Sequence, residues 1–268
     1  MKIINVLFTL ILIVIKVSTY EEVIDLWGDA SPPYDDGQKA ELHIFLPDDK
    51  PTGRAIVICP GGGYGFVSME NEGTSWAPFF NEIGISVFIL NYRLPKGDRR
   101  LPMSDAEEAI KFVRANADKF KINPEEVGIM GFSAGGHLAS TIATHSEDDA
   151  KPDFPILFYP VITMEDSYTH AGSKKNFLGE NPIQKLIEEF SNEKKVTKDT
   201  PRAFIILSND DKTVPPSNGV NYYLECNKNK VSASLHIFPT GGHGWGFKTT
   251  FEYHEEVKEE LKAWLNSF

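Results

Sequence analysis

A serine stands between two glycines in the stretch GIMGFSAGGHLAS. Ser133 follows the apolar run VGIMG and precedes AGGHLASTIATH, whose small residues favour a helix. The pattern predicts a tight strand-to-helix turn, the nucleophile elbow, where side chains larger than those of Gly131 and Gly135 would collide. At such a helix N-terminus, free backbone N–H groups favour developing negative charge. We therefore predict that Ser133 is a nucleophile; the competing interpretation is a glycine-rich helix that only packs against a strand.

A serine hydroxyl needs a base to take its proton, and a histidine late in the chain is the expected one. His243 lies in the glycine-rich stretch PTGGHGWGF, directly after the last apolar run, LHIF. Flexible flanks would let its imidazole reach back to Ser133. His137 follows the serine on the same helix and His236 lies inside an apolar run, so we expect both to be structural. We predict that His243 is the base.

Two neighbouring aspartates are candidates for the acid that orients this histidine. They occur in SNDDKTVPPSNG, directly after the apolar run AFIIL. Ligand sites in parallel sheets lie at the carboxyl ends of strands, and an acid there would fix the histidine tautomer and stabilise the imidazolium. We favour Asp210 for this role, with Asp211 as the alternative, because a surface aspartate can instead cap the turn.

Three consecutive glycines follow another apolar run in ICPGGGYGF. Because glycine has no side chain to obstruct the backbone, such N–H groups can approach a charged oxygen closely. We expect the amides of Gly62, Gly63 and Ala134 to form an oxyanion hole. A phosphate-binding loop is the alternative, but the sequence has neither GK[ST] after these glycines nor a GxGxxG with a ribose-binding acid.

Apolar, β-branched runs recur along the chain and predict the strands that must position these groups. Six runs are typical of buried parallel strands, and an earlier alternating run is typical of an antiparallel edge strand. Helical patterns between them predict a mostly parallel, doubly wound α/β sheet flanked by helices. One helix begins with a capping box, Ser104 and Glu107. The predicted strands are 40–46, 55–59, 85–90, 127–131, 155–161, 203–207 and 235–238, and the predicted helices are 73–83, 104–119, 216–228 and 251–267.

The polar segment 163–200 breaks this alternation. It contains one amphipathic piece, PIQKLIEEF. We predict a small insertion between two strands, placed where a lid or substrate-shaping element would lie.

The 268 residues suit a single α/β domain, which we place at residues 20–268. Before it, Lys2 precedes the apolar run IINVLFTLILIVI and a group of small residues. This pattern predicts a signal peptide at residues 1–19 and a secreted or periplasmic protein. An uncleaved N-terminal anchor is the alternative, because Lys16 interrupts the apolar run.

The formal net charge of −11 argues against nucleic acid and anionic membranes as partners. Metal-ligand spacings such as CxxC or HExxH do not occur, so we expect neither a metal nor a cofactor. Cys59 and Cys226 are expected to be buried free thiols rather than a disulfide.

Five stretches together resemble the secreted bacterial esterase/lipase group of the α/β-hydrolase superfamily that includes acetyl xylan esterases. They span roughly residues 40–268. The chain departs from the related lipases at one position: their glycine loop reads HGGG, whereas this chain has Pro60 before the three glycines. DDKTVP also resembles the acid-bearing turn of prolyl oligopeptidase relatives, whose first aspartate is the triad member. The stretches are CPGGGYGF, NYRLP, LPMSDAEEAIKFVRANADKFKINPEEVGIMGFSAGGHLAS, SNDDKTVP and GGHGWG.

The resemblance implies the α/β-hydrolase fold and a Ser133–Asp210–His243 triad. It also implies a serine carboxylesterase that removes acetyl or other short acyl groups from carbohydrate esters of the xylan type through an acyl-enzyme. The alternatives are a general short-chain esterase or lipase, a serine peptidase, and a non-catalytic hydrolase-like binding protein. The rings of Tyr64 and Trp245 flank the predicted site, and we expect them to bind substrate, although packing in the core is the commoner role of such residues.

Overall fold

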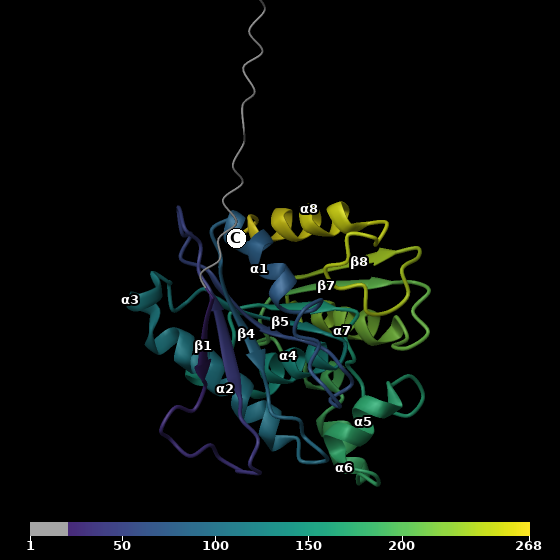
Figure 1. Cartoon of the computed structure of the whole chain (residues 1–268). Helices are drawn as coiled ribbons and strands as arrows, with labels where there is room; N and C mark the ends of the chain where they lie inside the picture. The colour runs from purple at the N-terminus through teal and green to yellow at the C-terminus, as the bar shows by residue number, and fades with distance from the viewer. Residues whose placement is uncertain (1–20) are drawn as a thin grey trace, which may run out of the picture.

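The computed structural model describes residues 21–268, and the predicted signal peptide lies outside them. An eight-stranded sheet runs through the middle of the molecule in the order β1-β2-β4-β3-β5-β6-β7-β8 (Figure 1). β2 pairs antiparallel with β1 and β4, and the remaining pairs in this order are parallel. The strands are β1 (Glu21–Asp25), β2 (Glu41–Phe45), β3 (Ala55–Cys59), β4 (Ser86–Asn91), β5 (Val127–Phe132), β6 (Pro155–Phe158), β7 (Ala203–Ser208) and β8 (Ala233–Phe238).

This arrangement confirms the predicted mostly parallel sheet, with one difference at its edge. β2 is antiparallel as expected, but β1 covers it, so the edge strand is β1. β3, β5 and β7 are buried along their whole length. Helices cover both faces of these central strands, which explains why their sequences are continuously apolar rather than alternating.

Helices flank the sheet on both faces, as predicted. Figure 1 shows α1 and α8 over one face and α2, α4 and α7 over the other. The helices are α1 (Ala77–Glu82), α2 (Arg100–Ala115), α3 (Ala117–Phe120), α4 (Ser133–His145), α5 (Ala171–Leu178), α6 (Gln184–Glu189), α7 (Ser217–Lys228) and α8 (His254–Leu265).

The predicted capping box at the start of α2 is wrong. The helix begins at Arg100, one turn earlier, where Pro102 fits the first turn because its missing N–H would have no partner there. Ser104 lies inside the helix and donates its hydroxyl to the carbonyl of Leu101. Glu107 instead accepts a hydrogen bond from the hydroxyl of Ser146 in the segment after α4.

The predicted insertion between β6 and β7 is present and carries α5 and α6, which lie side by side beyond α4 (Figure 1). Hydrogen bonds join it to the rest of the domain. Asn176 Nδ2 donates to the carbonyl of Gly63 (2.8 Å), and His137 Nε2 on α4 bonds to the carbonyl of Phe190 (2.8 Å).

Both thiols, Cys59 and Cys226, are buried and free, as expected. Between residues 21 and 268, none of the helices has the length and apolar character needed to cross a membrane.

Candidate active site

Ser133 occupies the turn between β5 and α4, as the glycine pattern predicted. β5 ends at Phe132, α4 begins at Ser133, and the serine has a positive φ of 52°. This conformation is strained for a residue with a side chain and persists only where the surroundings impose it. A Cβ on Gly131 would collide with the carbonyl of Gly135, and one on Gly135 with the carbonyl of Cys59. The two glycines are therefore required by close backbone approach.

His243 lies within hydrogen-bonding distance of the serine. Its Nε2 is 2.8 Å from Ser133 Oγ, and its Nδ1 is 2.6 Å from Asp211 Oδ2. A carboxylate can only accept, so Nδ1 carries a proton and the neutral ring accepts the serine hydroxyl at Nε2. This tautomer is the one that can take a proton from the serine.

The carboxylate that bonds to His243 belongs to Asp211, which corrects the prediction of Asp210. Asp211 is 5% exposed, and its Oδ1 accepts the amides of Thr213 and Val214, both at 2.9 Å. These bonds aim the other oxygen at the imidazole. Asp210 is exposed and accepts the amide of Gly242 (2.8 Å) in the histidine loop.

The glycine loop after β3 presents unpaired amides beside the serine. Within residues 21–268, neither the Gly62 nor the Gly63 amide donates a hydrogen bond, and both residues line the cavity that contains Ser133. Their φ values of 126° and 63° are positive. Ala134 lies in the first turn of α4, where N–H groups have no partner inside the helix. The structure thus brings the three predicted amides close to Ser133, and their role as an oxyanion hole stays a prediction.

The cavity over the serine has a volume of about 460 Å³. This is within the usual range for a small-molecule site. Most of its further lining residues carry polar side chains, but more of the lining surface is apolar than polar, and Phe66 contributes an aromatic ring that is 62% exposed. The further lining residues include Phe66, Ser68, Asn71, His170, Thr213 and Lys248. Within the part of the chain that the structure describes, no three His, Cys, Asp or Glu side chains gather as a metal site would require.

Comparison with known proteins places this fold and geometry in a family. The BD-FAE family model matches residues 42–224. The chain belongs to the BD-FAE family. It is 47% identical to an acetylxylan esterase from Xylanibacter ruminicola over 237 residues, or 87% of this chain and 49% of that protein. It is 34% identical to endo-1,4-beta-xylanase B from Butyrivibrio fibrisolvens, over 76% of this chain and 34% of that protein.

The chain thus spans about half, or less, of the length of these two relatives. A solved structure is matched over nearly its full length. This is an acetyl ester-xyloside bifunctional hydrolase from Caldicellulosiruptor lactoaceticus, with 35% identity, a TM-score of 0.86, and coverage of 92% of this chain and 96% of that one. These findings confirm the α/β-hydrolase fold and the resemblance to acetyl xylan esterases.

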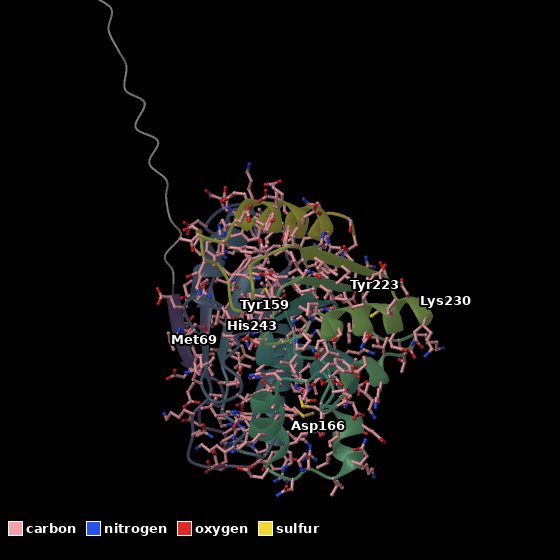
Figure 2. All side chains as sticks on the ribbon, turned by 90° about the vertical axis from the view of Figure 1, so that its right-hand side faces the viewer. Met69, Tyr159, Asp166, Tyr223, Lys230 and His243 are labelled. Carbon is pink, nitrogen blue, oxygen red and sulfur yellow. The ribbon has the colours of Figure 1, made fainter. Side chains whose placement is uncertain are left out.

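In this BD-FAE chain, a buried carboxylate links the two loops that carry the site. Glu72 Oε2 accepts the amide of Gly61 (2.9 Å), and Oε1 accepts the hydroxyl of Tyr159 (2.7 Å). That hydroxyl accepts the amide of Gly246 (2.9 Å), and the Tyr159 ring packs edge-on against His243, 4.9 Å between centroids (Figure 2). Burial raises the pKa of Glu72, against the lowering effect of its hydrogen bonds. Sequence reasoning missed both residues, because neither lies in a recognisable motif.

The expectation that Tyr64 and Trp245 bind substrate is wrong, because the rings are 1% and 3% exposed. The Tyr64 hydroxyl bonds to His137 Nδ1 (2.9 Å) behind the glycine loop. Trp245 Nε1 donates to Ser208 Oγ (3.0 Å) at the end of β7. In the BD-FAE chain these two aromatic residues are buried behind the loops, where they pack and form hydrogen bonds, and they do not face the cavity.

Proposed function

We propose that this chain is a serine carboxylesterase that removes acetyl or other short acyl groups from carbohydrate esters. The observation that carries the proposal is the hydrogen-bonded series from Ser133 to His243 (2.8 Å) and from His243 to Asp211 (2.6 Å), beside unpaired amides. Support for the substrate class comes from the acetylxylan esterase and acetyl ester-xyloside hydrolase among its similar proteins.

In the proposed reaction, Ser133 Oγ attacks the ester carbonyl while His243 Nε2 takes the hydroxyl proton. The carbonyl oxygen becomes an oxyanion and is stabilised by the amides of Gly62, Gly63 and Ala134. His243 then protonates the departing sugar oxygen, which leaves an acyl-enzyme. Water, deprotonated by the same imidazole, releases the acid and restores the serine. Asp211 holds the ring in the required tautomer and stabilises its protonated form.

The lining of the cavity supports a short acyl group and a polar alcohol. The unassigned lining side chains include Ser68, Asn71, Thr213 and Lys248, which offer hydrogen-bonding groups to the alcohol part of an ester.

The decisive experiment measures acetate release from acetylated xylan and acetylated monosaccharides, beside a chain-length series of nitrophenyl esters. We expect the wild type to act on the acetyl esters, and Ser133→Ala to stay folded and lose at least about 1,000-fold in kcat. Undiminished turnover by the alanine variant would exclude the serine mechanism. Turnover of long-chain esters alone would exclude the carbohydrate substrate.

We also propose that the protein acts outside the cytoplasm, as a secreted or periplasmic enzyme. The support is the charged and then apolar N-terminal pattern. N-terminal sequencing of the protein recovered from the periplasm and medium tests this proposal. Recovery of the uncleaved chain in the cytoplasm alone would contradict it.

A further inference from the structure

His170 belongs to the insertion and lines the same cavity as Ser133 and His243. It stands immediately before α5 and its side chain caps that helix. The ring is half-buried. The mechanism above gives this histidine no role.

The hydrogen bonds of His170 fix where its proton lies. Its Nδ1 is 3.2 Å from the backbone N and 2.8 Å from the Oγ of Ser173. A backbone N–H can only donate, so Nδ1 must be an acceptor, and the proton of the neutral ring lies on Nε2. Burial lowers the pKa of His170 below its ordinary value, and the neighbouring His243 lowers it further, against a smaller opposing effect of Asp211. No group within residues 21–268 accepts a hydrogen bond from Nε2.

The position of this donor is tied to the glycine loop. A side-chain carbon at Gly63 would lie 3.6 Å from His170 Cε1, the ring atom next to Nε2. Asn176, on the helix that His170 caps, holds the carbonyl of Gly63 at 2.8 Å. The free donor is therefore positioned by the same helix that anchors the proposed oxyanion loop, which is the kind of support that precise recognition requires.

We propose that His170 Nε2–H donates a hydrogen bond to a sugar hydroxyl of the bound ester and so selects carbohydrate esters over esters of simple alcohols. The inference rests on the proposed function and deepens it. The ester carbonyl already has three amide donors, which leaves a hydroxyl of the alcohol part as the oxygen for this imidazole. His170 is a specificity residue: it transfers no proton. A site that hydrogen-bonds a substrate hydroxyl discriminates strongly against analogues that lack it.

The test compares the wild type with His170→Asn. Asparagine keeps an acceptor for the amide of Ser173, and hence the helix cap, but is too short to place a donor where Nε2 lies. The matched control is His236→Asn, a half-buried histidine on β8 that bonds to Ser234. Each variant is assayed on monoacetylated methyl xyloside, on its deoxy analogues that lack one free hydroxyl, and on 4-nitrophenyl acetate.

We expect His170→Asn to lower kcat/KM for the acetylated xyloside about 10- to 100-fold, mainly through KM, and to affect nitrophenyl acetate much less. One deoxy analogue should be poor for the wild type yet lose little further in the variant, because the same hydrogen bond is already absent. His236→Asn should leave the ratio of the two substrates unchanged.

Equal losses on both substrates would overturn the inference, because they would indicate a structural role. Unchanged kinetics on the xyloside would also overturn it. These outcomes differ from failure of the proposed function, in which the wild type itself would not hydrolyse acetylated xylosides or Ser133→Ala would match it.

Discussion

Asp210 and Asp211 are adjacent, yet their carboxylates have different surroundings. Asn209 donates its amide to the carbonyl of Phe238 (2.8 Å), which extends the β7–β8 ladder one residue past the end of β7. The chain turns at Asn209 and Asp210, and the amide of Asp211 closes this turn on the carbonyl of Ser208 (3.4 Å). Asp210 therefore lies at the surface and Asp211 turns inward. Residue types alone cannot give this result, because it depends on how far pairing with a distant strand continues.

The pair offers a matched test. Asp211→Asn should lower kcat for nitrophenyl acetate about 10³- to 10⁴-fold, because an amide can favour the wrong histidine tautomer and cannot stabilise the imidazolium. Asp210→Asn changes only an exposed hydrogen bond to Gly242 and should cost less than about 10-fold. Steady-state kinetics at saturating substrate measures both. If the Asp210 variant were the more damaged one, the assignment of Asp211 would be wrong.

At the scale of elements, the loops after β3 and β8 depend on each other through Glu72 and Tyr159. The glycine loop receives its support at Gly61 and the histidine loop at Gly246. Asn71 adds a third link, because its Nδ2 donates to the carbonyl of Gly244 (3.2 Å). The oxyanion donors and the base are thus positioned by one shared polar network.

Glu72→Gln should disturb this network while keeping the shape of the side chain. Glutamine has one amide oxygen and one NH₂ group in place of the two carboxylate oxygens. The NH₂ group would face either the Gly61 amide or the Tyr159 hydroxyl, and that donor would lose its acceptor. Since small displacements of reacting groups are costly, we expect kcat to fall about 10- to 100-fold with little change in KM. The control is the exposed neighbour, Glu70→Gln. A change in KM alone would show that Glu72 acts on substrate binding rather than on positioning.

The strands and helices were largely predictable, because the apolar pattern of consecutive residues indicates a buried strand or an amphipathic helix. The approach of His243 to Ser133 was also predictable, since glycines mark the turns that carry both residues. The network residues were not found, because Glu72 and His170 acquire their surroundings only from distant segments. The start of α2 was misplaced for a related reason: Arg93 and the helix residue Asp105 form a fully buried ion pair, so tertiary contacts help to set where the helix lies.

At the scale of the whole molecule, His137 connects the region behind the nucleophile to the insertion. Its Nε2 faces the carbonyl of Phe190 and must donate, so Nδ1 accepts the Tyr64 hydroxyl. Burial lowers the pKa of His137 to about 3, with a smaller opposing effect from the bond to Phe190. The folded protein therefore holds this ring neutral over most of the acidic range.

This shift predicts a loss of stability in mild acid. The folded-state pKa lies below the unfolded value of 6.5, so the unfolded chain binds the extra proton, and stability falls as pH drops from about 6.5 towards 3. Between pH 7 and pH 5 this single group should cost about 2 kcal/mol of unfolding free energy. Urea denaturation at both pH values, compared with His137→Gln, isolates the effect. Equal losses in the two proteins would assign the acid sensitivity to other groups.

The proposed reacting groups follow four separate strands: the glycine loop follows β3, Ser133 follows β5, Asp211 follows β7, and His243 follows β8, which pairs with β7 at one margin of the sheet. The site is therefore complete only when all four strands are in place, and we expect ester turnover to be among the last properties to return when the denatured chain refolds. Far-ultraviolet circular dichroism will recover while the inner strands associate, whereas ester turnover will return only once the C-terminal strand has docked. A stopped-flow experiment that follows both signals tests this expectation, and simultaneous recovery of ester turnover and circular dichroism would contradict it.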